Sequence, residues 1–280
     1  MSSTLYIVAT PIGNLSDMTF RAIEILKSVS VIAAEDTRHS QRLLSHYDIH
    51  TPLFSLHDYN EEARIEKIMA LLESGKSVAL ISDAGTPLIS DPGFRLVRAV
   101  RHAGFKVISI PGACAAITAL TVSGLPTDRF IFEGFLPAKT GALESQLEKL
   151  KNETRTIIFY ESVHRIVKTL SAMKKIFGEK RIATVARELT KSFETVKQDT
   201  LENLSEWIEK NTEQQKGEFV IVVQRTDLSE YPDTVFSTRE VLQHLLTELP
   251  LKQAVSLTCK ITGKNRNTLY SLALEIKPKD

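Results

Sequence analysis

Four short apolar runs in the first 120 residues, each followed by a segment with helical periodicity, constrain the fold of this chain more than any other feature. The runs span residues 5–10, 29–35, 77–82 and 105–110. Strands that are apolar throughout must be covered on both faces, as they are in a parallel sheet with helices on each side. The segments between them place apolar residues three or four apart, as such helices require. The pattern predicts an α/β domain with a parallel sheet.

A turn-rich segment at 121–129 ends this domain, and a second region of strand and helix patterns follows it. The second region has strand candidates at 129–135, 155–162, 182–188 and 217–225. A polar segment at 228–234 contains Pro232 and predicts a linker, and three helix patterns without a strand follow it. We therefore predict two α/β domains, 1–123 and 124–228, and a helical tail at 235–280.

Composition excludes several classes of protein. The formal net charge is +1, so any surface for a polyanion must be a local patch. Cys114 and Cys259 are the two cysteines, far apart and in no metal spacing, which predicts no zinc site and fits a reducing compartment. The N-terminus lacks the pattern of a signal peptide, and the longest apolar stretch is broken at Pro111. We expect a cytoplasmic protein that is not in the membrane.

The stretch SDAGTPLISDPG, residues 82–93, follows a buried strand and is the strongest candidate for a ligand loop. Open α/β sheets bind ligands at the carboxyl ends of their strands. Gly85 allows close approach of the backbone, two prolines stiffen the loop, and Ile89 supplies part of an apolar wall. The competing interpretation is a plain helix start, with Asp91 as N-cap and Pro92 as the first helical residue.

Three more loops follow strands at the same predicted sheet edge. TPIGNLSD (10–17) is neither a dinucleotide fingerprint nor a P-loop, and it also fits an ordinary turn with Asp17 as N-cap. IPGACAAITAL (110–120) opens a helix with small residues, which suits either a ligand or close helix packing. AAEDTRHS (33–40) brings charged side chains to this edge, where capping and solvation are the alternative.

The second region and the tail supply further charged candidates. Lys139 precedes a predicted helix, where a cation opposes the helix dipole unless an anion binds there. The motifs YESVHR (160–165) and ARELTK (186–191) each follow a strand. They supply polar side chains that include Tyr160, Glu161, Arg165, Arg187 and Glu188, and buried Arg–Glu pairing between the two loops is the alternative. The tail has basic residues suited to a phosphate backbone, although they also fit a solvated helical cap; they are Lys252, Lys260, Lys264 and Arg266.

Eight motifs follow one another along the chain: LYIVATPIGNLSD, AAEDTRHS, LISDAGTPLISDPG, IPGACAAITAL, FEGFLPAK, FYESVHR, ARELTK and KGEFVIVV. Together they resemble the ribosomal RNA small subunit methyltransferase I family. This family belongs to the tetrapyrrole methylase superfamily, and the resemblance covers essentially the whole chain. It implies two α/β domains with S-adenosylmethionine in the cleft between them, a helix-turn-helix tail and a homodimer. It also implies methylation of the ribose 2′-oxygen of one cytidine in the decoding centre of 16S ribosomal RNA, within the small ribosomal subunit, and no metal.

The resemblance assigns cofactor contacts to nine positions, namely Pro11, Ser82, Asp83, Thr86, Ile89, Cys114, Ala115, Phe159 and Gly217. For the chemistry, our hypothesis takes a carboxylate as base and basic side chains as phosphate or alkoxide stabilisers; these are Glu35, Asp36 or Glu188, and Arg38, Lys139 and Arg187. Two rival functions are a methyltransferase acting on a tetrapyrrole and a non-enzymatic RNA-binding module. The first loop, TPIGNL, departs from the glycine-richer loop of tetrapyrrole-modifying relatives.

Overall fold

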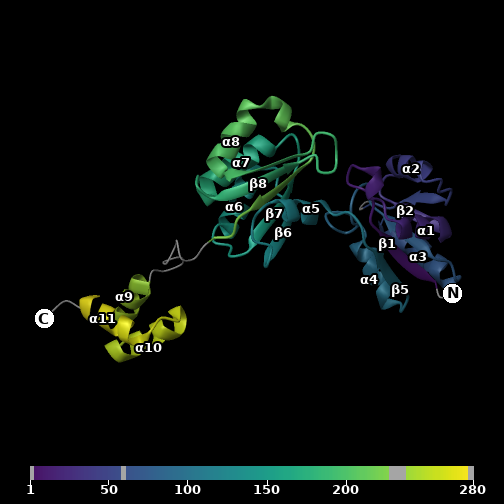
Figure 1. The fold of residues 1–280 in the computed structure, drawn as a ribbon. Coiled ribbons are helices and arrows are strands. Elements are labelled where there is room, and N and C mark those ends of the chain that lie inside the picture. Colours follow the sequence, from purple (N-terminus) through teal and green to yellow (C-terminus); the bar gives the residue numbers. More distant parts are fainter. Residues whose placement is uncertain (1–2, 58–60, 227–237, 277–280) are drawn as a thin grey trace. The chain divides into compact units, whose positions relative to one another are not determined.

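The structure, a computed structural model, describes residues 3–57, 61–226 and 238–276. The chain divides into two units, residues 1–225 and 226–280 (Figure 1). The first unit contains two five-stranded sheets, and the second contains helices. The predicted linker at 228–234 lies outside the described residues.

The first sheet is parallel, as predicted, and has the strand order β3-β2-β4-β1-β5. Its strands are β1 (Thr4–Val8), β2 (Val31–Ala34), β3 (Leu53–Ser55), β4 (Val78–Ile81) and β5 (Lys106–Ile110). The apolar runs predicted four of these strands, and β3 is an additional three-residue edge strand. From β1 the chain passes beyond β4 to form β2, and from β4 it later passes beyond β1 to form β5. The loops after β1 and β4 therefore lead in opposite directions along the sheet.

Helices cover both faces of this sheet. They are α1 (Phe20–Ser28), α2 (Thr37–His46), α3 (Glu61–Glu73) and α4 (Phe94–His102), with the short 3-10 helix η1 (Leu15–Asp17) before α1. Leu26 of α1 and Leu44 of α2 pack with Ile32 on one face. Leu72 of α3 and Leu96 of α4 pack on the other face. The two-sided burial inferred from the strand composition is present in β1, β2 and β4. It is wrong for the edge strand β5, where Lys106 and Ser109 are exposed, because β5 has a neighbouring strand on one side only.

The second sheet is mixed, with the order β6-β7-β10-β8-β9. Its strands are β6 (Phe130–Phe135), β7 (Thr156–Glu161), β8 (Ile182–Arg187), β9 (Thr195–Thr200) and β10 (Phe219–Val223), and β6 and β7 form its one parallel pair. One face is covered by α6 (Thr140–Leu150), α7 (Ile166–Phe177) and α8 (Leu201–Lys210), and the 3-10 helix η2 (Thr212–Gln215) follows α8 (Figure 1).

Helix α5 (Ala115–Val122) covers the opposite face of the second sheet. Ala116, Ala119 and Leu120 pack with Ile158 and Val220. This helix lies in the segment predicted for the first domain, 1–123, although its buried face is turned to the second sheet. The small residues of IPGACAAITAL thus permit close packing of a helix on a sheet, which was one of the two interpretations of that motif.

The second unit consists of α9 (Thr238–Glu248), α10 (Leu251–Thr262) and α11 (Arg266–Ile276). It has its own core, formed by Leu242, Ala254, Val255, Leu269 and Ala273. Helix α10 ends at Gly263, whose φ of 69° gives the left-handed turn before α11. The helical prediction for this segment is correct within the described residues.

Two predicted helix caps are wrong. Asp91 does not cap α4, because Gly93 is the N-cap with φ 122° and the helix begins at Phe94. Asp17 ends the 3-10 helix η1, and the N-cap of α1 is Thr19, which accepts a hydrogen bond from the Ala22 N–H. The Asp91 carboxylate is therefore not used by the helix that follows it.

Candidate functional site

The loops after β1 and β4 are joined at the point where the chain diverges on the first sheet. Thr10 N–H donates to the Gly85 carbonyl at 2.8 Å, and Gly85 N–H donates to the Thr10 carbonyl at 3.0 Å. The Thr86 hydroxyl donates to the Ala113 carbonyl at 2.9 Å, which adds the loop after β5. Three strand-to-helix loops thus meet where open α/β sheets bind ligands.

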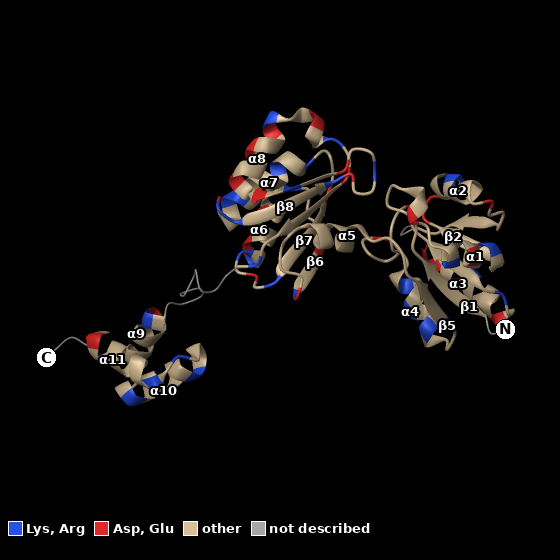
Figure 2. Cartoon of the chain, in the orientation of Figure 1, with Lys and Arg blue, Asp and Glu red and all other residues tan. Residues whose placement is uncertain are grey.

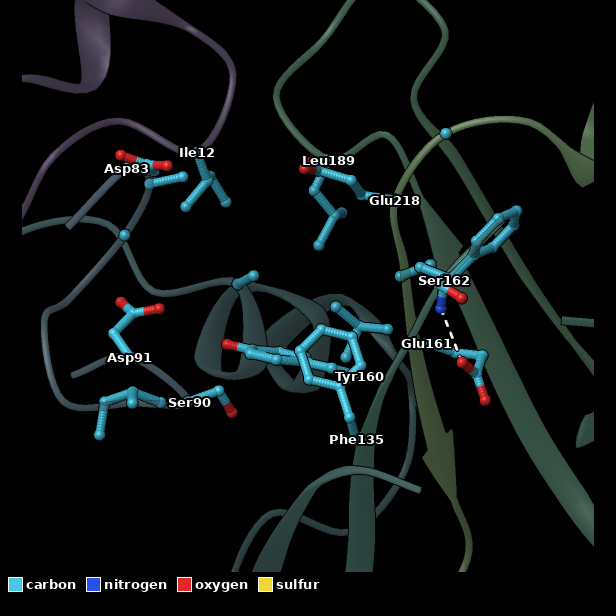
Figure 3. Close-up of a pocket in the computed structure, with 18 of the residues that line it drawn as sticks. Ile12, Asp83, Ser90, Asp91, Phe135, Tyr160, Glu161, Ser162, Leu189 and Glu218 are labelled. Atoms are coloured by element: carbon cyan, nitrogen blue, oxygen red, sulfur yellow. Dashed lines mark hydrogen bonds between the residues drawn. The ribbon is translucent and has the colours of Figure 1, made fainter. Parts of the chain in front are cut away.

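A cavity of about 450 Å³ lies at this sheet edge, within the size range of small-molecule sites (Figure 3). Residues of both sheets line it. The loops of the first sheet contribute Ile12, Glu35, Asp83, Ala84, Gly85, Thr86, Ile89, Ser90 and Asp91. The second sheet and α5 contribute Ala115, Phe135, Tyr160, Glu161, Ser162, Val163, Ala186, Leu189, Gly217, Glu218, Phe219 and Val220.

Three carboxylates, which we call the acidic cluster, gather on the first-sheet wall: Glu35, Asp83 and Asp91. The Asp36 N–H donates to Asp83 Oδ1 at 3.0 Å, and the Asp83 N–H donates to Glu35 Oε2 at 3.5 Å. Burial, together with repulsion from Glu35 and Asp83, raises the pKa of Asp91 to about 6, and a hydrogen bond from Ser82 opposes that rise.

The described lining residues of the cavity include no Lys, Arg or His. Two further acidic residues line the second-sheet wall and are paired: Glu161 with Arg165 at 2.8 Å, and Glu218 with Lys191 at 2.8 Å. The acidic cluster therefore gives this cavity a negative potential, which suits a ligand carrying positive charge.

One part of the cavity wall is apolar. Ile12, Ala186, Leu189 and Val220 are buried and belong to one apolar cluster, which joins the two sheets. An added Cβ at Gly85 would lie 3.3 Å from Ile12 Cγ2. Because glycine has no Cβ, the backbone of this loop can pack closely against the Ile12 side chain. An apolar wall beside an acidic cluster suits a ligand with a planar apolar part and a cationic part.

An aromatic wall is formed by Tyr160 between Phe132 and Phe135. The ring centroids lie 4.8 Å from Tyr160 to Phe132 and 5.6 Å from Tyr160 to Phe135, both in edge-to-face geometry. The Tyr160 hydroxyl accepts a hydrogen bond from the Ala116 N–H at 3.1 Å, in the first turn of α5. Burial raises the pKa of Tyr160, so its hydroxyl stays protonated and can also donate. In Figure 3 this hydroxyl points toward the Asp91 side.

Five of the nine predicted cofactor positions line the cavity: Asp83, Thr86, Ile89, Ala115 and Gly217. Ser82 is buried beneath it, and its hydroxyl hydrogen-bonds Asp91. Pro11 and Cys114 adjoin lining residues without being among them. The Phe159 side chain is fully buried in the core on the opposite face of the second sheet, so only its backbone faces toward the site.

Of the predicted catalytic residues, Glu35 lines the cavity and the others do not. Asp36 caps α2 and pairs with the exposed Arg38 at 3.2 Å, and this hydrogen bond lowers the pKa of Asp36. Lys139 is exposed at the N-cap position of α6. The remaining two are Arg187, the last residue of β8, and Glu188, which directly follows it.

Arg187 and Glu188, at the end of β8 and directly after it, are not among the residues that line the cavity. Arg187 is buried and donates to the carbonyls of Lys216 and Phe193. The Arg–Glu pair of this region lies within the motif YESVHR, between Arg165 and Glu161, and not between the two loops as the alternative had it. Burial raises the pKa of Glu188, but hydrogen bonds from the Glu218 N–H and from Lys191 outweigh that effect and lower it. Both residues thus serve the loop's structure.

The four basic residues of the tail, Lys252, Lys260, Lys264 and Arg266, are exposed on α10, the turn after it and the start of α11 (Figure 2). None is taken up by the core of the second unit. This leaves their charges available to a partner.

Two features of the described residues bear on ligands and membranes. They contain no group of three or more His, Cys, Asp or Glu arranged to hold a metal ion. Of the helices in the described part of the chain, none is long and apolar enough to cross a membrane.

Sequence reasoning named Tyr160 as a side chain that follows a strand, but it did not predict the aromatic wall, and it assigned Asp91 to a helix cap. The position of Tyr160 directly after the apolar run TIIF was a usable signal, because the end of a buried strand is where a side chain reaches the sheet edge. Phe135 carried no such signal, because its orientation depends on an irregularity in β6.

The comparisons with known proteins cover both units. A family model described as Tetrapyrrole (Corrin/Porphyrin) Methylases matches residues 4–205, and one described as the RsmI C-terminal HTH domain matches residues 237–277. Among solved structures, a uroporphyrin-III C-methyltransferase from Thermus thermophilus, complexed with S-adenyl homocysteine, superposes with a TM-score of 0.54 and 16% identity over 79% of this chain and 96% of that one.

Curated relatives are much closer in sequence. The protein named ribosomal RNA small subunit methyltransferase I from Haemophilus influenzae is 50% identical over 98% of this chain and 97% of its own. Its namesake from Pseudomonas aeruginosa is 48% identical over 98% of both chains. This identity extends through the sheets that form the cavity and through the helical tail. The chain therefore belongs to the ribosomal RNA small subunit methyltransferase I family, and its fold is that of the tetrapyrrole methylases.

Proposed function

We propose that this protein is an S-adenosylmethionine-dependent methyltransferase that acts on ribosomal RNA of the small subunit. The observation that carries the proposal is its likeness, over 98% of its length, to relatives that bear that name. At finer detail we propose the ribose 2′-oxygen of a cytidine in the decoding centre of 16S ribosomal RNA as the methyl acceptor. The resemblance also leads us to propose a homodimer that works in the cytoplasm.

The cavity fits the proposed donor. S-adenosylmethionine supplies an activated methyl group on a positively charged sulfur, and the acidic cluster offers that charge a complementary environment. The apolar wall of Ile12, Leu189 and Val220 suits the adenine ring. Asp83 and Thr86 offer oxygen atoms that can accept hydrogen bonds from ribose hydroxyls and the ammonium group.

Positioning of the acceptor can supply much of the rate acceleration, because the methyl donor is already activated. A base would help to remove the proton of the ribose hydroxyl. Among the three predicted bases, Glu35 is the one that lines the cavity, whereas Asp36 and Glu188 are engaged elsewhere. We therefore assign this role to Glu35. Arg38 and Lys139 are exposed, and we propose that they contact phosphates outside the cavity.

The test is methyl transfer to small ribosomal subunits purified from cells that lack the corresponding gene. Radiolabelled S-adenosylmethionine is the donor, and the RNA is then hydrolysed with alkali. A 2′-O-methyl group blocks cleavage of the adjacent phosphodiester, so the expected result is label in an alkali-resistant dinucleotide that contains cytidine.

The other outcomes separate the alternatives. Label in an alkali-sensitive nucleotide keeps the methyltransferase and moves its target atom. No label in RNA, with demonstrated donor binding, favours a tetrapyrrole acceptor. RNA binding with neither donor binding nor transfer favours the binding module. The Glu35→Gln variant should bind donor and lose turnover, and near-normal turnover would rule out the base assigned above.

A further inference from the structure

A β-bulge interrupts strand β6 beside the cavity. Phe132 stands opposite Ile158 of β7, and Gly134 stands opposite the next residue, Phe159. Glu133 is therefore an extra residue in β6 that has no opposing residue in β7. Gly134 has φ 63°, a conformation that glycine adopts without strain. Bulges occur next to active sites, where they redirect a side chain.

This bulge changes the face to which the following residues point. Phe135 stands opposite Tyr160, and both line the cavity. If regular pairing continued from Phe132 and Ile158 with no bulge, Phe135 would stand opposite Glu161, on the other face of the sheet. A shift of one residue in register reverses the face to which each side chain points. With the bulge in place, Leu136 is the residue that enters the core on the α6 and α7 face.

The redirected ring of Phe135 is exposed although it lines the cavity. Its exposed fraction is 53%, whereas Ile12, Leu189 and Val220 at the apolar wall are each below 9%. A methyl donor bound in the cavity would lie against the buried apolar wall. The exposed rim at Phe135 would then be free to contact the RNA acceptor. The ring also lies edge-to-face against Tyr160, which is itself held by the Ala116 N–H.

The charge of the lining decides which part of an RNA can enter. The acidic cluster repels phosphates, and the described lining residues have no cation to offset it. A base or a ribose carries no such charge. Enzymes that recognise RNA commonly splay out a nucleotide and stack its base on an aromatic side chain.

We propose that Phe135 is the platform on which a base of the substrate RNA stacks when its ribose enters the cavity. This inference rests on the proposed function, because it requires an RNA acceptor. Phe135 is thus a positioning residue at the rim. Its contribution should appear in the use of RNA and not in the binding of the methyl donor.

The experiment measures two quantities for each purified full-length variant: the Kd for S-adenosylhomocysteine by calorimetry, and KM and kcat for small subunits from cells lacking the gene. Phe135→Ala should raise KM by about tenfold to a hundredfold, the range expected for one stacked base, and leave the Kd within about twofold. Phe135→Trp should keep KM within about threefold of wild type, because it retains a stacking face.

Two further variants separate stacking from other roles. Phe135→Leu keeps an apolar side chain and loses the aromatic face, so it should behave as Phe135→Ala. Phe130→Ala is the matched control, since Phe130 is a 40% exposed phenylalanine on the same strand and does not line the cavity. It should leave both quantities unchanged.

The outcomes distinguish this inference from the proposed function. If wild type methylates the subunit and Phe135→Ala has an unchanged KM, the platform is wrong and the function stands. A weaker donor Kd in Phe135→Ala and Phe135→Leu would place the ring against the donor and overturn the inference. If wild type methylates no RNA, the proposed function fails and the platform fails with it.

Discussion

Asp91 is a partly buried carboxyl that lines the cavity close to two other acidic residues. Its pKa is raised to about 6 by burial first and then by Glu35 and Asp83. A carboxyl whose pKa is higher in the folded state stabilises the protein most below its unfolded value, near pH 4. That stabilisation is lost as the pH rises toward 6, so the ionised group is a net cost at neutral pH.

We predict that Asp91→Asn makes the ligand-free protein more stable at pH 7.5 and less able to bind the donor. The gain in unfolding free energy should be about 1 kcal/mol, below the roughly 3 kcal/mol of the full shift, because the partly solvated carboxyl is screened. Urea unfolding at pH 4 and pH 7.5 measures this, and the gain should vanish at the lower pH.

Donor affinity provides the second measurement for Asp91. The wild-type Kd for S-adenosylmethionine should tighten between pH 5 and pH 7 as Asp91 ionises, and Asp91→Asn should weaken binding at pH 7.5 by about fivefold. The variant should also lose most of the pH dependence. An unchanged pH profile in Asp91→Asn would assign the titration to another group.

Gly217 forms part of the cavity and cannot accept a side chain. Its φ is 96°, and an added Cβ would lie 2.5 Å from the carboxylate of Glu188. Gly178 has the same φ of 96° with nothing within 4 Å of an added Cβ. We predict that Gly178→Ala, at φ 96° and ψ 149°, costs about 1–3 kcal/mol of backbone strain, whereas Gly217→Ala also displaces the Glu188 carboxylate and therefore costs more. Thermal unfolding with and without S-adenosylhomocysteine compares them, and equal losses would contradict this prediction.

Among the helices and strands, the sequence predicts the strands whose apolar residues are buried on both faces. It does not predict short or polar strands, whose place depends on local geometry. The runs before Thr10 and Ser82 were recognised because both faces of their strands are covered. Strands β3 and β9 were not, because LFS has three residues and TVKQDT is polar, and each lies at a sheet edge with one neighbouring strand.

The candidate site divides in the same way. Loop residues such as Asp83, Thr86 and Gly217 could be named from their motifs, because their place follows from strand ends. Phe159 was assigned to the cofactor, whereas its neighbour Tyr160 is the residue whose side chain lines the cavity. The alternation of faces along a strand decides which neighbour reaches the cavity, and the motif does not reveal which face a residue takes. Phe135 depends on the bulge, and Asp91 was assigned to a cap because Gly93 was not expected to begin α4.

Helix α5 offers a test at this scale. The Tyr160 hydroxyl of β7 accepts a hydrogen bond from the Ala116 N–H and so anchors the first turn of α5 to the sheet. We predict that Tyr160→Phe lowers the free energy of unfolding by about 1 kcal/mol, the usual value of one hydrogen bond. Urea denaturation is the measurement, with Tyr270→Phe on the exposed face of α11 as a neutral control. No difference between the two variants would show that water replaces the hydroxyl.

At the scale of the whole molecule, the two units have separate cores and can be separated experimentally. We predict that a chain ending at Arg225 keeps its affinity for S-adenosylhomocysteine and loses affinity for RNA. Charge is the physical reason, because Lys252, Lys260, Lys264 and Arg266 are exposed on the second unit. A full chain with all four changed to Gln should show the same RNA defect and a salt dependence of RNA binding that is shallower by about three units of slope.

Loss of donor binding in the shortened chain would instead mean that the helical unit supports the first unit. Wild-type RNA affinity in the Gln variant would show that these four side chains do not contact phosphates. Filter binding over a range of salt concentrations measures the affinity for RNA and its salt dependence, and calorimetry measures the affinity for S-adenosylhomocysteine.

The order of strands in the second sheet has a consequence for synthesis. Strand β10, at Phe219–Val223, is made last among the strands of the described residues, yet it lies in the middle of the sheet between β7 and β8. The first sheet can close once Ile110 has left the ribosome, but the second cannot close until more than 100 residues later. From the completion of β8 until β10 is made, β7 and β8 each carry an unpaired edge. Unpaired strand edges make partly folded chains prone to aggregate.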